Sequence, residues 1–231
     1  GLICPDKRYD KDTTSAAGAY VATPKKGMHK WVGSIDLNSL YPSIIRSCNM
    51  STETIIGQVR QVYTKELIAN AKTVAEAWEG RFACPEYELV MQKNIEEILH
   101  LDFEDGTSFE ATGAEIYEIV FNSGQPWIIS ANGTIFTYEK KGVIPGLLER
   151  WYAERKVLQT KARDARAEGG DKFAYWDKRQ LVKKINLNSL YGALLNPGSR
   201  FFDSRLGQST TLTGRCIAKH MAGELNKIIA G

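Results

Sequence analysis

The segment Asp36–Ile45 (DLNSLYPSII) constrains this chain most, because it places a carboxylate, a tight turn and an aromatic ring side by side. The preceding run Trp31–Ile35 alternates in hydropathy and predicts a core strand that ends at Asp36. A carboxylate at the end of a strand either shapes a turn or binds a metal ion. Hard divalent ions such as Mg²⁺ are held by one or two carboxylates together with substrate phosphates. One Asp alone leaves both interpretations open.

A second segment, Lys184–Gly192 (KINLNSLYG), carries three functional side chains at helical spacing. On a helix, Lys184, Asn188 and Tyr191 lie at i, i+4 and i+7 and therefore share one face. That face presents a positive charge, an amide and an aromatic ring, a set suited to a nucleoside triphosphate. Taken singly, a lysine on a long helix usually faces water and a tyrosine usually packs in a core.

Together the two segments resemble motif A (DxxSLYPS) and motif B (KxxxNSxYG) of the family B DNA polymerases, in the same order. The residues of the two motifs are most similar to those of the T-even-like bacteriophage enzymes. The pair Asn188–Ser189 differs from the corresponding helix of family A polymerases, and Gly18–Val21 resembles a segment that precedes motif A in family B. The resemblance implies an α+β fold: a polymerase palm, built from an antiparallel sheet with packed helices, and fingers formed by an antiparallel helical hairpin.

Charge is distributed unevenly along the chain. Residues 140–205 hold 15 Lys and Arg against 7 Asp and Glu, whereas the remainder holds 15 against 20. A basic module on a mildly acidic body is typical of a phosphate-binding region. A solvated helical face has the same composition, so charge alone does not decide between them.

Composition excludes several other classes of protein. No apolar run approaches the roughly 18 residues that a membrane span requires, and no signal-peptide pattern opens the chain. The 4 cysteines are scattered without a C-x-x-C pair, and the 3 histidines show no ligand spacing. A zinc site or a disulfide framework is therefore not expected.

We expect four segments: residues 1–57, the first part of the palm with motif A; 58–142, an elaboration of the palm with hairpins; 143–198, the fingers with motif B; and 199–231, a return to the palm. The patterns within them predict a short helix after Pro42, a helix at 66–78, hairpins at 95–110 and 127–139, and long helices at 146–166, 171–194 and 207–230. The hairpins are expected to turn at Asp105–Gly106 and Asn132–Gly133.

The resemblance implies roles for the residues of motif A. Asp36 would be a catalytic carboxylate that binds Mg²⁺, and the backbone carbonyl of Leu37 would complete the ligands. Tyr41 would lie beneath the incoming deoxyribose and leave no room for a 2′-hydroxyl; packing in the core is its ordinary alternative. The backbone N–H groups of Ser39, Leu40 and Tyr41, at the start of a short helix, would bind the β- and γ-phosphates.

The resemblance also implies roles for the fingers residues. Arg155 would bind the γ-phosphate of the dNTP, a task that suits its planar guanidinium. Lys184 and Asn188 would reach the same triphosphate from the second helix. Tyr191 and Gly192 would form the floor under the nascent base pair, although a packed helix residue followed by a packing glycine is the plainer interpretation. Some relatives carry a further basic residue one turn beyond the arginine, where this chain has Gln159.

The third family motif, YGDTDS, which supplies the other essential carboxylate, does not occur in this sequence. After Tyr191 the chain offers Asp203 as its only Asp and Glu224 as its only Glu. Because the chain opens on Gly1 and stops at Gly231 within an expected helix, we interpret it as an excerpt of a longer protein, or else as one half of a split enzyme.

The expected function is therefore template-directed extension of a DNA primer with dNTP through two Mg²⁺ ions, carried out by the complete protein and not by this segment alone. The expected partners are primer-template DNA, dNTP, a C-terminal palm and thumb with the second catalytic Asp, and a sliding clamp, in the cytoplasm of a host cell and without a membrane. One alternative is a non-catalytic, polymerase-like subunit that binds nucleic acid. A generic basic helical binding module is a further alternative, but it does not explain motif A.

Overall fold

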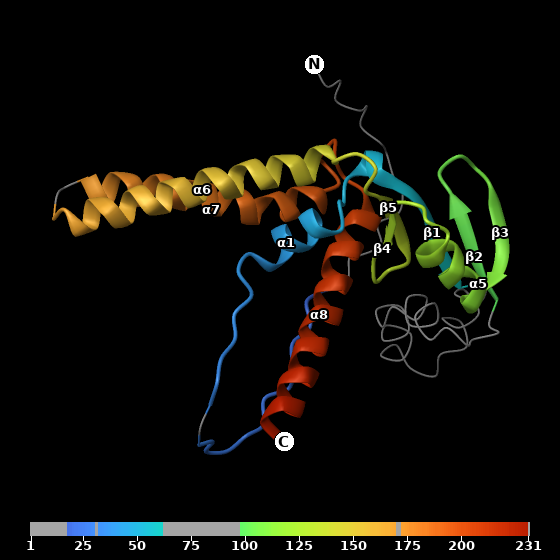
Figure 1. Ribbon diagram of the computed structural model, residues 1–231, viewed down its shortest axis with the longest axis horizontal. Helices are drawn as coiled ribbons and strands as arrows, with labels where there is room; N and C mark the ends of the chain where they lie inside the picture. Colours follow the sequence, from blue (N-terminus) through green and yellow to red (C-terminus); the bar gives the residue numbers. More distant parts are fainter. Residues whose placement is uncertain (1–17, 31, 62–97, 170–171, 231) are drawn as a thin grey trace.

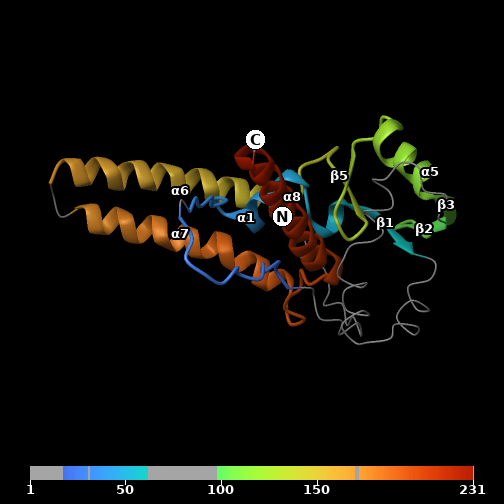
Figure 2. The same ribbon diagram turned by 90° about the horizontal axis from the view of Figure 1, so that it is seen from below.

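The computed structural model describes residues 18–30, 32–61, 98–169 and 172–230 of the chain. These residues form a sheet at one end of the molecule, a long helical arm that projects from it, and a third long helix that runs away from both (Figure 1). The same arrangement is visible from below, where the two helices of the arm still run side by side (Figure 2). The fold is therefore α+β, as the sequence predicts.

The sheet has five strands in the order β3-β2-β1-β5-β4, and all neighbours are antiparallel. The strands are β1 Ile55–Gln61, β2 Ile98–Phe103, β3 Ser108–Thr112, β4 Trp127–Ile129 and β5 Thr134–Thr137. The β2–β3 and β4–β5 pairs confirm both predicted hairpins. Each turns at its expected glycine, since Gly106 and Gly133 have φ values of +88° and +80°, which L-residues rarely adopt.

Gly133 is required for a second reason. A Cβ at this position would lie 2.4 Å from the carbonyl oxygen of Val59 on β1. The Val59 N–H in turn donates to the Gly133 carbonyl at 2.8 Å, so the β4–β5 turn lies directly against the central strand. Only a residue without a side chain permits this approach.

One face of the sheet is covered by a short helix, α5 Gly113–Tyr117, and by the single π-helical turn η2 Glu118–Asn122 that continues it. The helix begins at a capping box in which Thr112 and Glu115 each accept from the backbone N–H of the other. The buried residues between this helix and the sheet are Val59, Leu99, Leu101, Ala111, Ile116, Val120, Ile129 and Ile135.

The projecting arm is a helical hairpin of α6 Val143–Ala167 and α7 Lys172–Leu194. It confirms the two long helices predicted at 146–166 and 171–194, although α6 begins three residues earlier than its pattern suggests. Gly169 follows the end of α6 with φ of +70°, as a helix-terminating glycine should. The N-cap predicted at Asp171 lies outside the described residues.

A second core joins the base of the arm to the rest of the molecule. It contains residues of α1 Leu40–Ser47, of both arm helices, of β1 and β5, and of the long helix α8 Ser204–Ala230. The short 3₁₀ turn η1 Thr52–Thr54 leads from this region into β1. The buried residues are Ile44, Ile45, Met50, Ile55, Phe136, Ile144, Leu148, Leu187, Leu194 and Leu206. This core sets the position of α1 relative to α7.

One predicted element is wrong. Residues 32–36 form no strand in the structure, and Val32 and Ile35 are 79% and 59% exposed. A strand needs a hydrogen-bonded neighbour and one buried face. The sheet ends at β3 on one side and β4 on the other, and segment 32–36 pairs with neither. Trp31 and the helix predicted at 66–78 lie outside the described residues.

None of the helices in the described part of the chain combines the length and the apolar character that crossing a bilayer requires.

Candidate functional site

The two sequence motifs meet where α1 contacts α7. The rings of Tyr41 and Tyr191 lie 4.6 Å apart between centroids, with their planes tilted by 43°. Beside them, Leu40, Tyr41, Pro42 and Asn188 line an open pocket of about 200 Å³. Three residues that the sequence assigns to a nucleotide site, two from motif A and one from motif B, therefore share one surface.

Helix α8 forms the wall behind the two rings. The Tyr191 hydroxyl hydrogen bonds to the Thr211 hydroxyl, and burial raises the pKa of Tyr191 above its ordinary value, which already keeps a phenol neutral at neutral pH. Gly214 lies against Tyr41, because a Cβ there would be 3.2 Å from Cε1 of that ring. Gly192 is exposed, and a Cβ added to it would meet nothing within 4 Å.

The N-terminus of α1 opens without a side-chain cap and without an acidic residue in its first turn. Ser39 precedes it with φ of +52°, and the Ser43 N–H donates to the Ser39 carbonyl at 2.9 Å. Among the described residues, the N–H groups of Ser39, Leu40 and Tyr41 have no hydrogen-bond partner. Unpaired N–H groups at the start of a helix favour an anion, both by donating and through the helix dipole.

Farther out, one ion pair and one hydrogen bond between side chains cross from α6 to α7 among the described residues. Glu154 forms an ion pair with Lys183 at 2.5 Å. Its neighbour Arg155 is half-buried and donates from Nε to Oε1 of Gln180 at 3.3 Å. Lys184 differs from Lys183, because it is exposed and forms no ion pair with any residue that the structure describes.

Gln180, Lys184 and Asn188 form a row along α7 at i, i+4 and i+8, which spans about 12 Å of the helix axis. The outer end of this row contacts Arg155 on α6, and its inner end lines the pocket beside Tyr41. The amide of Asn188, the amine of Lys184 and the guanidinium of Arg155 thus follow one another outward from the aromatic ring.

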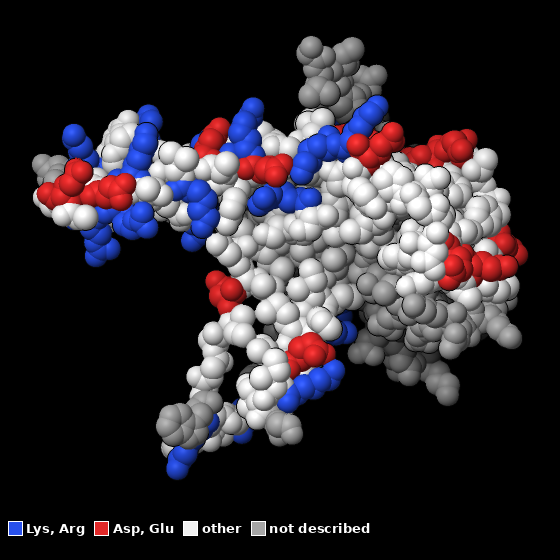
Figure 3. All heavy atoms as spheres, in the orientation of Figure 1, with Lys and Arg blue, Asp and Glu red and all other residues white. Residues whose placement is uncertain are grey.

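Lys and Arg side chains gather along the arm and at its base (Figure 3). Part of this charge lies over aromatic rings of the facing helix: Lys161 Nζ lies 4.7 Å from the Trp176 ring centre, and the Arg166 guanidinium lies 5.6 Å from that of Phe173. Such contacts help to join the two helices. Some of the basic residues of 140–205 therefore help to join the two helices, and others are exposed to solvent.

Asp36 and Leu37 lie in the exposed segment just before α1 and outside the pocket lining. Within the described residues, no group of three or more His, Cys, Asp or Glu side chains is placed to bind a metal ion. A two-ion centre needs more than one carboxylate. The described residues thus offer Asp36 as a single candidate ligand, and they do not by themselves fit such a centre.

The motifs did not indicate several residues that shape this region: Glu154, Asp177, Gln180, Lys183, Thr211 and Gly214. Gln180 had a detectable signal, since it stands four residues before Lys184 and so continues the same helical row. The others act through contacts between distant segments, for which the local sequence carries no pattern.

The chain is similar to several known DNA polymerases. The chain is 27% identical to the DNA polymerase of Red sea bream iridovirus, covering 98% of the chain and 24% of that protein. It is 27% identical to the DNA-directed DNA polymerase of Enterobacteria phage T4, with 93% of the chain and 24% of that protein covered. The chain thus spans about a quarter of the length of these relatives.

The fold matches the solved structure of the family B DNA polymerase from the archaeon Pyrobaculum calidifontis, with a TM-score of 0.55 at 18% identity. That match covers 97% of this chain and 21% of the other. The family model described as DNA polymerase family B matches residues 1–230. The chain therefore belongs to DNA polymerase family B.

Proposed function

We propose that this chain is the palm and fingers of a DNA polymerase that transfers nucleotides from dNTP to a primer 3′-hydroxyl under the direction of a template. The observation that carries the proposal is the meeting of the two motifs, where Tyr41 contacts Tyr191 and shares a pocket with Asn188. Family membership supports it, because the named relatives are DNA polymerases. We propose the division 1–57, 58–142, 143–198 and 199–231 for palm, elaboration, fingers and returning palm.

In this proposal the triphosphate of a dNTP lies along the row on α7. Lys184 and Asn188 contact it, Arg155 binds its γ-phosphate from α6, and the unpaired N–H groups at Ser39, Leu40 and Tyr41 bind the phosphates from the other side. Each group donates hydrogen bonds, and the two basic ones also offset the phosphate charge. The row of about 12 Å is long enough to follow a triphosphate from its sugar outward.

The sugar and the base occupy the inner end of the site. Tyr41 lies under the deoxyribose and excludes a 2′-hydroxyl by its volume. Tyr191 and Gly192 form the floor under the nascent base pair, and the open space over Gly192 leaves room for a base. The neutral phenol of Tyr191, bonded to Thr211, keeps this floor uncharged and fixed.

For the metal we propose that Asp36 and the Leu37 carbonyl bind Mg²⁺ in the complete polymerase, where a carboxylate that residues 1–231 do not contain completes the site. The chain alone should therefore bind dNTP without catalysing transfer. The same proposal gives the partners of the chain as primer-template DNA, the remaining palm and thumb, and a sliding clamp. It also gives the cytoplasm of a host cell as its location. An origin in a T-even-like phage is also a proposal, since the chain is equally identical to the T4 and iridovirus polymerases.

The direct test is a titration of the chain with a fluorescent dNTP in the presence of Mg²⁺. We expect weak binding that Asn188→Ala reduces, and no primer extension. Unreduced binding in that variant would contradict the assignment of Asn188 to the dNTP site. Primer extension by the chain alone would contradict the proposal that the metal site needs a further carboxylate. In the complete polymerase, Asp36→Asn should abolish extension and preserve the affinity for primer-template DNA, and a retained extension rate would exclude Asp36 as a ligand.

The absent Asp-Thr-Asp sequence favours a second candidate, a polymerase-like subunit that binds nucleic acid without catalysis. The gene distinguishes the two. A segment with Asp-Thr-Asp in the same or an adjacent reading frame supports the active enzyme, and its absence supports the inactive subunit.

A further inference from the structure

Arg155 on α6 is held by a neutral group and not by a carboxylate. Its Nε donates to the Gln180 amide oxygen at 3.3 Å, and its terminal amino groups have no hydrogen bond or ion pair within the described residues. A guanidinium has five N–H donors in a rigid plane, so one bond at Nε fixes the plane and leaves the outer fork available. That fork can bind a phosphate with two parallel hydrogen bonds.

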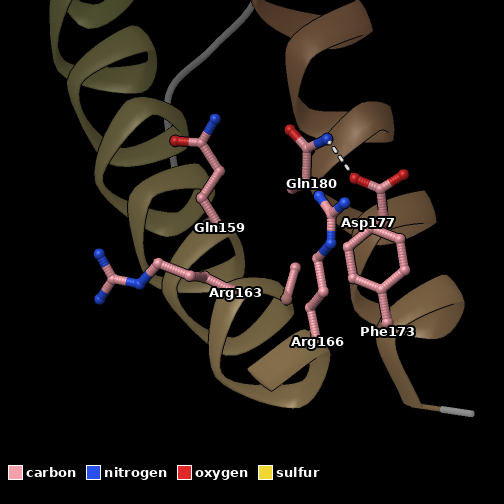
Figure 4. Close-up of a pocket in the computed structure, with 7 residues that line it drawn as sticks. Gln159, Arg163, Arg166, Phe173, Asp177 and Gln180 are labelled. Atoms are coloured by element: carbon pink, nitrogen blue, oxygen red, sulfur yellow. Dashed lines mark hydrogen bonds between the residues drawn. The ribbon is translucent and has the colours of Figure 1, made fainter. Parts of the chain in front are cut away.

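The orientation of Gln180 is itself fixed by Asp177, one turn earlier on α7. The Gln180 amide nitrogen donates to Oδ1 of Asp177 at 3.0 Å, and the pair is visible at the pocket between the arm helices (Figure 4). A carboxylate only accepts, so it selects the NH₂ end of the amide. The carbonyl end must then face Arg155, which only donates.

A neighbouring contact shows what this arrangement avoids. Lys183 is paired with Glu154 at 2.5 Å, which neutralises its charge within the hairpin. Gln180 orients Arg155 without cancelling its charge. Glu154 and Arg155 are neighbours on α6, and their contacts with α7 differ in effect. The ion pair of Glu154 neutralises the charge of Lys183, whereas the hydrogen bond of Arg155 to Gln180 orients the guanidinium and leaves it charged.

Packing does not account for a glutamine at this position. Gln180 is half-buried and lines an open cavity of about 280 Å³ between α6 and α7. An apolar side chain would fill that space equally well and would need no partner. The remaining lining residues are Gln159, Ala162, Arg163, Arg166, Phe173 and Asp177.

We infer that Gln180 is a positioning residue that orients the Arg155 guanidinium toward the terminal phosphate of the nucleotide, with Asp177 fixing the amide. This inference rests on the proposed function, because it requires a triphosphate in the site. Gln180 itself touches no phosphate, and its effect passes through Arg155.

The test measures the affinity of the chain for dNTP and for the matching dNDP in Mg²⁺. For the unaltered chain we expect a preference for dNTP that Arg155→Ala removes. Gln180→Leu should lower dNTP affinity by about five- to tenfold, the weight of one typical hydrogen bond, and change dNDP affinity by less than about twofold. In the Arg155→Ala background Gln180→Leu should have no further effect on dNTP affinity.

Two further variants separate orientation from charge and from folding. Asp177→Asn can donate as well as accept, so it no longer selects the NH₂ end of Gln180, and it should weaken dNTP binding less than Gln180→Leu does. Gln180→Glu keeps the acceptor for Arg155 but neutralises the guanidinium and places a second carboxylate against Asp177, so it should also lose the preference for dNTP. Because Glu and Gln occupy nearly the same volume, this variant reports on the inference even if Gln180→Leu does not fold.

The outcomes distinguish the inference from the proposal beneath it. If Arg155→Ala removes the preference for dNTP and both Gln180 variants retain it, the positioning role is wrong and the nucleotide site stands. The positioning role is also wrong if Gln180→Leu lowers the affinities for dNTP and dNDP equally. It is wrong too if Gln180→Leu lowers dNTP affinity as much in the Arg155→Ala background as it does in the unaltered chain. If the unaltered chain shows no preference for dNTP over dNDP, the assignment of Arg155 and the inference fall together.

Discussion

The phenolic rings of Tyr41, on α1, and Tyr191, on α7, are in contact across the junction of the two motifs. Both rings are backed by α8, one by Gly214 and the other by the Thr211 hydroxyl. The ring proposed to sense the sugar is thus supported by the ring proposed to hold the base pair. We therefore expect a substitution of one ring to shift the position of the other.

Replacing Tyr41 by Ala removes the ring that would exclude a 2′-hydroxyl. We expect the ratio of dNTP to rNTP affinity to fall by about tenfold or more, equivalent to about 1.4 kcal/mol of discrimination. The measurement is a paired titration with dNTP and rNTP of the same base. Tyr41→Phe is the matched control, since it keeps the ring and should keep the discrimination. Unchanged sugar discrimination in Tyr41→Ala would remove the proposed role.

The consecutive lysines Lys183 and Lys184 offer a comparison of two charges at adjacent positions. Lys184 is exposed and forms no ion pair among the described residues, so Lys184→Met should weaken Mg²⁺-dependent dNTP binding and leave the melting temperature nearly unchanged. Lys183 is paired with Glu154, and its ammonium lowers the pKa of that carboxyl. Lys183→Met should therefore lower the melting temperature slightly and preserve dNTP affinity. The reverse pattern would exchange the roles of the two residues.

The sequence predicted those elements whose signals are local. Asn132–Gly133 and Asp105–Gly106 each predicted a turn because their glycines adopt positive φ, and helical spacing predicted the arm because both of its helices are long. The strand at 32–36 was predicted from alternation alone. Alternation describes the faces of a strand but not its neighbour, and no strand of the described sheet pairs with this segment.

The candidate site divides in the same way. Lys184, Asn188 and Tyr191 could be placed on one helix face from their spacing, and the structure shows the latter two beside Tyr41. The roles of Thr211 and Gly214 depend on how α8 packs against α1 and α7. Such contacts are fixed by the shared core and not by any local pattern, so sequence reasoning could not reach them.

The start of α6, which carries Arg155, is tied to the sheet by Asn49. This buried residue is 5% exposed and has φ of +51°. Its amide nitrogen donates to the carbonyls of Thr137 and Lys140, both at 2.8 Å, and its amide oxygen accepts from the Gly142 N–H at 2.9 Å. One side chain thus satisfies three backbone groups at the base of the arm.

Replacing Asn49 by Ala should therefore lower the free energy of unfolding by about 3 kcal/mol, at about 1 kcal/mol for each lost hydrogen bond. Urea denaturation measures this change. Asn49→Gly separates the effect of the lost hydrogen bonds from the effect of backbone strain, because glycine adopts positive φ without strain. This variant should still show most of the decrease in unfolding free energy expected for Asn49→Ala. A change within about 0.5 kcal/mol for Asn49→Ala would show that water replaces these bonds.

Glu53 caps the same helix through its carboxylate. One oxygen accepts from the Val143 N–H at 2.6 Å and the other from the Ser51 hydroxyl at 2.6 Å. Burial alone would raise the pKa of Glu53, but the hydrogen bonds from Ser51 and Val143 outweigh it, so the pKa lies below its ordinary value. The ionised form is therefore the one that stabilises the fold.

Because the folded pKa of Glu53 is lowered, its contribution to stability is complete above the pKa of the unfolded chain, about 4.3, and is lost as the pH falls through the lower, folded value. The measurement is the difference in unfolding free energy between the unaltered chain and Glu53→Gln across pH 7 to 3. This difference cancels the titration of other carboxylates, which both proteins share. It should be constant and positive from pH 6 to 7 and shrink below about pH 4.3. A difference that grows on acidification would mean that the protonated form of Glu53 is the stabilising one, and that the cap of α6 does not depend on its charge.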